Sequence, residues 1–287
     1  MNEPLIKITG LCKSYKQHQA LKGLDLNVMA GEVLAFLGPN GAGKTTTINI
    51  LTGLLQLDAG EVCYDGVLFN PENLSQKRVM GVVPQHNNLD RDLTVARNLK
   101  VHGLLFGMRG KILVKRIYEV LELVDMLDLF DRPAGKLSGG QKRRLIIARA
   151  LLHNPKILFL DEPSTGLDVE ARRTLHKIIA GLKAKAGVSV FLTTHYIEEA
   201  DLLADRVAFI ESGQIVALGN PDELKSSIGR YALECYDDGE FLTLYFNNRE
   251  AAVNAAGVRT EEVRIREVTL EDVYLKYTGK KMGCANV

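Results

Sequence analysis

Three features that mark secreted, membrane-spanning or nucleic-acid-binding proteins are missing from this 287-residue chain. The four cysteines, Cys12, Cys63, Cys235 and Cys284, include no C-x-x-C pair, which argues against a disulfide framework or a zinc site. Lysine and arginine number 36 against 35 aspartate and glutamate, so no overall charge draws the chain to nucleic acid or to an anionic membrane. No apolar run approaches the roughly 18–20 residues of a membrane span.

The beginning of the chain also lacks the basic and apolar regions of a signal peptide. We therefore expect a cytoplasmic protein with reduced thiols, whose attachment to a membrane would depend on a partner. The chain is long enough to form one large domain and a smaller one, and to bury a sizeable core.

The most informative segment is 38–46, GPNGAGKTT, which follows the apolar run 33–37 and leads into a helix-like run. This is the G-x-x-x-x-G-K-T pattern in its expected position between a strand and a helix. Glycines let backbone N–H groups turn towards phosphate oxygens, and the helix adds the positive end of its dipole. We expect Lys44 to contact the β- and γ-phosphates and Thr45 to offer its hydroxyl to Mg²⁺. The residues predicted to surround the phosphates are Gly38, Asn40, Gly41, Gly43, Lys44, Thr45 and Thr46.

Acidic and polar side chains follow two further apolar runs that are typical of buried strands. Asp161 and Glu162 follow the run 157–160, and His195 comes shortly after the run 188–192. The carboxyl edge of an open α/β sheet is where ligands bind, and adjacent carboxylates there are costly unless a cation or a reaction uses them. Asp161 suits indirect Mg²⁺ coordination, and Glu162 suits the general base that orients an attacking water. We expect His195 to touch phosphate.

Between residues 86 and 153 apolar residues recur with helical spacing, which predicts a largely helical insertion. Ser138 fits the N-cap of one of these helices, and the two glycines after it leave free N–H groups at a helix start, a second anion-binding site. The basic triplet 142–144 continues that helix. We expect this triplet to be a solvated helix face, because no aromatic residues interleave it as they do in a nucleic-acid patch.

The two ends of the chain carry weaker signals. Near the start, strand-like runs at 5–8 and 24–28 flank a turn at 14–21, in which Tyr15 either stacks on a purine base or packs against the strands. Beyond Pro221 the predicted elements are a hairpin at 231–246, a strand at 263–266 and a helix at 270–278. We therefore expect a nucleotide-binding domain over 4–221 and a small β/α extension over 222–287.

Taken together, these motifs resemble the ATP-binding subunit of an ABC transporter over about residues 4–220. The loop 38–46 looks like the Walker A loop, 157–162 like the Walker B strand, and 137–141 like the LSGGQ signature. Four further features complete the set: Gln85 resembles the Q-loop glutamine, 164–168 the D-loop, His195 the switch histidine and Tyr15 the A-loop aromatic. Phosphate loops occur in many NTPases, but this ordered set is specific to the family.

The resemblance implies an α/β P-loop NTPase fold: an ABC-type nucleotide-binding domain with an antiparallel β subdomain, a helical signature subdomain and the small C-terminal β/α extension. It implies ATP and Mg²⁺ as cofactors, with Gln85 serving both catalysis and the metal. It also implies a homodimer that sandwiches ATP, in which Ser138 and Gly140 meet the γ-phosphate held by the partner chain. Asp168 of the D-loop belongs to the same nucleotide-binding set.

A narrower resemblance is to the daunorubicin-resistance and Nod-factor exporter branch. It lies in the stretches 81–85, 88–90, 142–145 and 270–275, whereas Gln141 departs from that branch, in which methionine is frequent. This resemblance implies the ATP-hydrolysing motor of an exporter of a hydrophobic drug, a lipid or a polysaccharide. Such a subunit works with separately encoded permease subunits, without nucleic acid, at the inner face of the cell membrane.

The alternative is a soluble ABC ATPase that acts on nucleic acid or ribosomes. DNA-repair relatives separate their two halves by a very long coiled coil, yet Gln85 and Ser138 are joined here by a short helical segment. Translation-factor relatives carry two cassettes in one chain, and this chain has one. A kinase or small GTPase would leave the signature and His195 unexplained.

Overall fold

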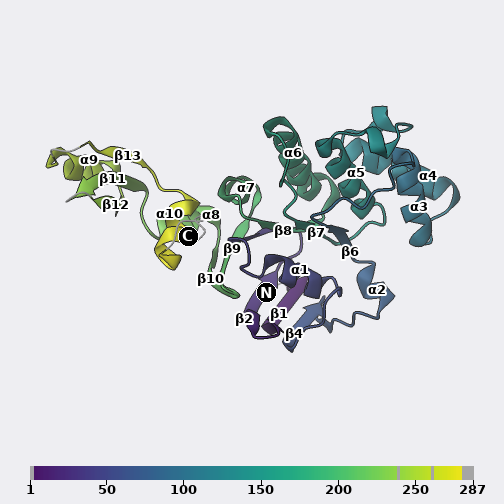
Figure 1. The fold of residues 1–287 in the computed structure, drawn as a ribbon, viewed down its shortest axis with the longest axis horizontal. Coiled ribbons are helices and arrows are strands. Elements are labelled where there is room, and N and C mark those ends of the chain that lie inside the picture. Colours follow the sequence, from purple (N-terminus) through teal and green to yellow (C-terminus); the bar gives the residue numbers. More distant parts are fainter. Residues whose placement is uncertain (1–2, 238–239, 260–261, 280–287) are drawn as a thin grey trace.

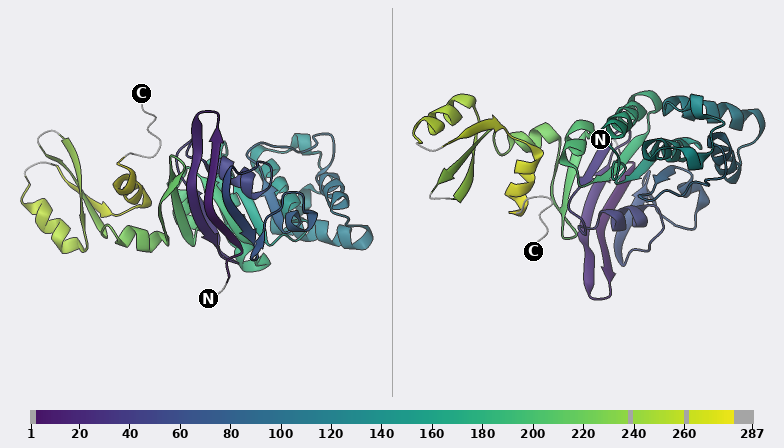
Figure 2. Two further views of the ribbon diagram at one scale, coloured as in Figure 1. Left: turned by 90° about the horizontal axis from the view of Figure 1, so that it is seen from below. Right: turned by 45° about the horizontal axis from the view of Figure 1, so that its top comes forward.

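The computed structural model describes residues 3–237, 240–259 and 262–279. Its strands form three sheets in an elongated molecule: two larger sheets lie beside one another, and a small C-terminal sheet lies apart at one end (Figure 1). The small C-terminal sheet lies at one end and the helices α3 and α4 lie at the other, with the central sheet between them (Figure 2). No helix among the described residues is both long enough and apolar enough to cross a bilayer.

The central sheet has six strands in the order β10-β9-β3-β8-β7-β6. Its strands are β3 (Val33–Leu37), β6 (Met80–Val83), β7 (Ile157–Asp161), β8 (Ser189–Thr194), β9 (Arg206–Glu211) and β10 (Gln214–Gly219). All are parallel to their neighbours except the edge strand β10. Leu37 of β3 pairs with Thr194 of β8, and Asp161 of β7 pairs with Thr193. The residues after β3, β7 and β8 therefore emerge together at the carboxyl edge of the sheet, as predicted from the apolar runs.

The N-terminal part of the chain forms a four-stranded antiparallel sheet, in the order β2-β1-β4-β5. Its strands are β1 (Ile6–Tyr15), β2 (His18–Val28), β4 (Ala59–Tyr64) and β5 (Val67–Leu68). The predicted turn at 14–21 is wrong in extent, because β1 and β2 form a long hairpin whose turn is only Lys16 and Gln17. Register shifts between Ile8 and Leu11 and again after Lys13 interrupt the apolar alternation, so the pattern alone shows two short strands.

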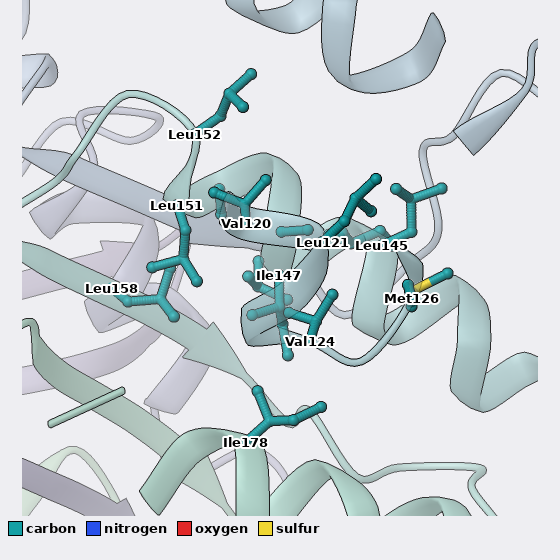
Figure 3. Close-up of a cluster of buried hydrophobic side chains, with 14 of the residues drawn as sticks. Val120, Leu121, Val124, Met126, Leu145, Ile147, Leu151, Leu152, Leu158 and Ile178 are labelled. Carbon is teal, nitrogen blue, oxygen red and sulfur yellow. The ribbon is translucent and has the colours of Figure 1, made fainter. Parts of the chain in front are cut away.

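The helices around the central sheet are α1 (Lys44–Leu51), α2 (Leu74–Lys77), α3 (Val95–Leu105), α4 (Gly110–Leu123), α5 (Gly139–Leu151), α6 (Val169–Ala186) and α7 (Ile197–Leu203). Two short 3₁₀ helices, η1 (Leu127–Leu129) and η2 (Ala134–Lys136), link α4 to α5. The span 86–153, predicted to be largely helical, contains α3, α4, η1, η2 and α5, although its first nine residues, 86–94, are not helical. Helix α5 joins the insertion to the sheet: Ile147 and Leu151 lie in the same buried cluster as Val120 of α4 and Leu158 of β7 (Figure 3).

The C-terminal part contains α8 (Pro221–Ser226), β11 (Tyr231–Asp237), β12 (Glu240–Phe246), α9 (Arg249–Gly257), β13 (Arg264–Glu267) and α10 (Leu270–Thr278). The predicted hairpin, strand and final helix are confirmed, and the hairpin's turn at 238–239 lies outside the described residues. Helix α9 was not predicted. Helix α10 returns to the central sheet, where the Tyr274 hydroxyl donates to Glu211 of β9 at 2.6 Å and its ring packs on Phe209.

Candidate functional site

The loop between β3 and α1 can be built only with glycine at two of its positions. A side chain on Gly38 would place Cβ 2.2 Å from the carbonyl oxygen of Ile210. Gly43 has φ +110°, and a Cβ there would lie 2.9 Å from the carbonyl oxygen of Ala20. Because Gly43 is also the N-cap of α1 and has no side chain, no side-chain cap bonds the first N–H groups of that helix. These donors are the ones that a phosphate group uses at a helix N-terminus.

Lys44, the first residue of α1, is buried with its ammonium group inside the loop. Its Nζ donates to the carbonyl oxygens of Gly38 at 2.8 Å and Pro39 at 3.0 Å. The same Nζ lies 3.2 Å from Oε1 of Glu162. The carbonyls and the carboxylate hold the cation in a fixed place at the floor of the loop, where it is screened from water.

Asp161 and Thr45 bring oxygen atoms together beside this cation. Thr45 Oγ1 donates to Oδ1 of Asp161 at 3.3 Å, and Thr193 Oγ1 donates to the same oxygen at 2.6 Å. Asp161 is 5% exposed, so its carboxylate depends on these hydroxyl groups for hydrogen bonds. No group of three or more histidine, cysteine, aspartate or glutamate side chains suited to a metal occurs among the described residues. The oxygen donors present suit a hard cation that also binds phosphate.

Glu162 lies between two basic side chains and has an unusual backbone. Its φ is +44°, a left-handed value that non-glycine residues rarely adopt. Oε1 faces Lys44, whereas Oε2 accepts a hydrogen bond from Thr165 Oγ1 at 3.2 Å and lies 3.2 Å from Nδ1 of His195. That histidine nitrogen approaches the carboxylate without hydrogen-bond alignment and has no hydrogen-bond partner among the described residues. Burial raises the pKa of Glu162, but Lys44 and His195 outweigh burial and hold this pKa below its ordinary value.

Lys44, Thr45, Glu162 and His195 line one hollow of about 620 Å³, whereas Asp161 does not line it and reaches it only through its hydrogen bond with Thr45. Its walls are formed by Tyr15, His18, Ala20, Asn40, Gly41, Gly43, Lys44, Thr45, Thr46, Gln85, Glu162, Thr165 and His195. Of the residues predicted around the phosphates, Gly38 alone is not in this wall, but its carbonyl oxygen bonds Lys44. Tyr15 is 46% exposed at the hairpin tip, so of the two alternatives its ring is open to a ligand rather than packed in the sheet.

Three further predicted residues lie in a second hollow of about 300 Å³, at the starts of α5 and α6. Ser138, Gly140 and Asp168 line it, and none of its lining residues lines the first hollow. Ser138 forms a capping box: its Oγ accepts from the N–H of Gln141 at 3.2 Å, and Gln141 Oε1 accepts from the N–H of Ser138 at 3.0 Å. Asp168 caps α6 by accepting from the N–H of Ala171 at 2.8 Å.

The prediction for the basic triplet 142–144 is wrong at its middle residue. Arg143 is 5% exposed and lies beneath the first hollow, where its guanidinium donates to three backbone carbonyl oxygens. Sequence spacing does not reveal this burial, because the acceptors are main-chain atoms of distant segments. Sequence reasoning also missed His18, which pairs with Tyr15 across the hairpin, and the hydrogen bond of Thr193 to Asp161. The sequence offered one signal for each residue: His18 lies close to Tyr15 in the chain, and Thr193 lies close to His195.

Comparison with known proteins places these features in one family. The family model described as ABC transporter matches residues 21–165. The Nod factor export ATP-binding protein I of Ralstonia nicotianae is 36% identical over 309 residues, an alignment that covers 97% of this chain and 95% of that protein. The protein of the same name from a Rhizobium species is 37% identical over 306 residues, with 98% and 99% covered.

Solved structures with the same fold include cbiO1 of Clostridium perfringens, described as part of the ABC transporter complex cbiONQ. The TM-score is 0.73 at 29% identity, with 78% of this chain and 91% of that chain covered. The ATP-binding cassette MJ0796, in a dimeric post-hydrolysis state bound to ADP and Pi, gives a TM-score of 0.67 at 30% identity, with 75% and 98% covered.

The fold and the first hollow define a P-loop nucleotide-binding cassette. The chain belongs to the ABC transporter family, as one of its ATP-binding subunits, and it is an ATPase.

Proposed function

We propose that two copies of this chain bind ATP between them, each nucleotide lying between the Lys44 hollow of one chain and the Ser138 hollow of the other. The observation that carries this proposal is that the two hollows share no residue. A nucleotide held by Lys44 therefore does not meet Ser138 of its own chain. The MJ0796 cassette has been solved as a dimer, in one case bound to ADP and Pi, which supports a dimer of this chain.

Within one chain, Lys44 holds the β- and γ-phosphates, and the uncapped N–H groups of α1 donate to them. Tyr15 stacks on the base at the open end of the hollow. Thr45, Asp161 and Gln85 fit a bound Mg²⁺, because Thr45 and Asp161 already bring their oxygens to 3.3 Å and Gln85 lines the same hollow. Such an ion would neutralise charge on the phosphate oxygens.

Hydrolysis then depends on Glu162 as the general base. Its lowered pKa keeps the carboxylate ionised at neutral pH, so that it can orient a water molecule and accept a proton from it. His195, which lies 3.2 Å from Glu162, contacts the γ-phosphate, and Gln85, which lines the same hollow, completes the set. Ser138, Gly140 and Asp168 add the partner chain's contacts.

We further propose that the cassette occupies residues 4–221, with its helical insertion at about 86–153, and that 222–287 form an appended unit. The chain would serve an exporter through a separately encoded permease, which would hold it at the inner face of the membrane. The relatives named Nod factor export ATP-binding protein I, similar along nearly the whole chain, support the role in export. We propose a hydrophobic drug, a lipid or a polysaccharide as the cargo.

The experiment uses the full chain with Glu162→Gln, which keeps the side chain's size but cannot accept a proton. ATP should convert this variant from monomer to dimer in size-exclusion chromatography. Adding Ser138→Arg should abolish the dimer by filling the second hollow, while ATP binding to the monomer changes little. Loss of monomer ATP binding would mean that Ser138 serves its own chain's nucleotide, and an intact dimer would remove Ser138 from the shared site.

A further inference from the structure

A single buried cation on α5 contacts two of the three loops that carry the proposed catalytic residues, those of Gln85 and Glu162. Arg143 donates from Nε to the carbonyl oxygen of Pro163 at 2.9 Å and from one terminal nitrogen to that of Asp161 at 2.9 Å. Its other terminal nitrogen donates to the carbonyl oxygen of Pro84. The three acceptors belong to two segments, 84 and 161–163, that are far apart in the sequence.

The positions of these acceptors relate Arg143 to the reaction. Pro84 directly precedes Gln85, whereas Asp161 and Pro163 are the two neighbours of Glu162. Glu162 has φ +44°, and a side-chain-bearing residue keeps such a conformation only where its surroundings enforce it. The hydrogen bonds of Arg143 to the carbonyls of Asp161 and Pro163 fix the backbone on both sides of Glu162. A planar guanidinium with five N–H groups can do this, because its donors are fixed relative to one another.

The positive charge of Arg143 is stabilised by the three backbone carbonyl dipoles that it bonds and by the nearby carboxylates of Asp161 and Glu199. Burial lowers the pKa of Arg143 to about 10, and nearby Asp161 and Glu199 favour the charged form. The side chain is therefore a cation at neutral pH and donates from all three nitrogens. On the other side of the same turn, Ser164 donates to the buried Glu199, which also lies 3.1 Å from His176 Nε2.

We infer that Arg143 is a positioning residue for ATP hydrolysis, which fixes the Gln85 loop and the Glu162 turn relative to one another through one guanidinium. It does not touch the nucleotide, since it lines neither hollow. Its helix begins at Ser138, in the second hollow, so the same helix links that hollow to both loops. This inference rests on the proposed role of Glu162 as the base.

The test replaces Arg143 in the full chain and compares it with an arginine of the same kind elsewhere. Arg116 of α4 also donates to two backbone carbonyls, those of Leu151 at 2.8 Å and Leu152 at 3.2 Å, but these lie at the far end of α5. Arg143→Met and Arg116→Met each remove a partly or fully buried guanidinium and leave carbonyl acceptors without it. Both variants are expected to lose thermal stability.

Only Arg143→Met should lose turnover specifically. Displacement of a catalytic group by about 1 Å costs on the order of 100-fold, so we expect kcat to fall about 10–100-fold. KM for ATP should stay within about twofold, because the contacts of Lys44 are untouched. Arg116→Met should keep its kcat. Hydrogen exchange should become faster at 83–88 and 161–165 in the Arg143 variant alone.

If Arg143→Met does not fold, Arg143→Lys tests the positioning role of Arg143 instead. A lysine keeps the charge, but its three N–H donors share one nitrogen and cannot reach carbonyls as far apart as the guanidinium does, so a smaller loss of kcat at constant KM is expected. The inference is overturned if the folded Arg143 variant has the kcat of Arg116→Met, or if KM rises as much as kcat falls. Near-normal turnover in Glu162→Gln would instead refute the proposed base, which separates the two failures.

Discussion

Helices α1 and α5 both begin beside glycine at the edge of a hollow, yet their first turns are built differently. At α1 the N-cap is Gly43, which has no side chain to bond the helix, and the next residue is the buried cation Lys44. At α5 the N-cap is Ser138, whose hydroxyl and Gln141 amide already satisfy two main-chain N–H groups through the capping box. A helix start attracts anions in both cases, but α5 has a side-chain cap on its third N–H group and α1 has none.

This difference indicates which of the two helix N-termini can bind a phosphate group without a second chain. The first hollow combines the uncapped start of α1 with Lys44 and Glu162, and Asp161 accepts a hydrogen bond from Thr45 in its wall, so one chain supplies both the proposed phosphate-binding cation and the proposed base. Two acidic side chains, those of Asp168 and Glu170, and one basic side chain, that of Arg144, line the second hollow, so its summed charge does not favour a lone anion. Its contribution is therefore expected only where a nucleotide is already held by another chain. The predictions below challenge that contrast in order of decreasing effect.

The largest effect is expected at Glu162, the proposed general base, which lines the first hollow only. Glu162→Gln removes the proton acceptor and keeps the side chain's size, so kcat should fall by roughly 10²–10⁴ while Mg·ATP still binds. Steady-state ATPase assays and nucleotide titration measure the two quantities. Glu72→Gln, an exposed glutamate outside both hollows, is the control and should hydrolyse ATP normally. A Glu162→Gln protein with near wild-type turnover would make His195 the next candidate for the base.

A smaller loss is expected where the first hollow holds phosphate by charge. Lys44→Ala removes a charge-assisted contact worth about 1.5–3 kcal/mol, which corresponds to weaker ATP binding by roughly one to two orders of magnitude. Hydrolysis should fall with it, because a nucleotide that does not bind is not cleaved. Isothermal titration with ATP measures the affinity. Wild-type affinity in this variant would show that the uncapped N–H groups of α1 suffice, and the contrast between the two helices would then rest on capping alone.

The same contrast shows what a sequence can reveal. Residues 38–46, Asp161, Glu162 and His195 could be placed because parallel strands end at one edge of a sheet, and the register of β3, β7 and β8 confirms that placement. Arg143 could not be placed, since its burial depends on carbonyl oxygens, which every residue carries. The separation of the two hollows is likewise a property of packing, in which α5 is held against the sheet by its apolar face.

A modest effect is expected at the cap that distinguishes α5. Ser138→Ala removes the N-cap hydroxyl, which typically costs about 1 kcal/mol of folding stability and corresponds to a fall of about 2–4 °C in Tm for a chain of this size. Thermal unfolding by circular dichroism measures the shift. ATP binding by the isolated chain should change little, because Ser138 does not line the first hollow. An unchanged Tm would mean that the capping box does not stabilise α5. The contrast between α5 and α1 would then have no energetic basis in capping.

The smallest effect concerns pH and the ionisation of Glu162. Lys44 and His195 outweigh burial and hold the pKa of Glu162 below its ordinary value of 4.5. A carboxylate with a depressed pKa in the folded state stabilises the fold above its unfolded pKa, and that contribution is lost as the pH falls through the folded pKa. The Tm of the wild type relative to Glu162→Gln should therefore be constant from pH 8 to about 6 and should decline below about 4.5. Thermal scans across this range measure the difference. A difference that begins to decline near neutral pH would mean that the pKa of Glu162 is raised, and that burial outweighs Lys44 in the first hollow.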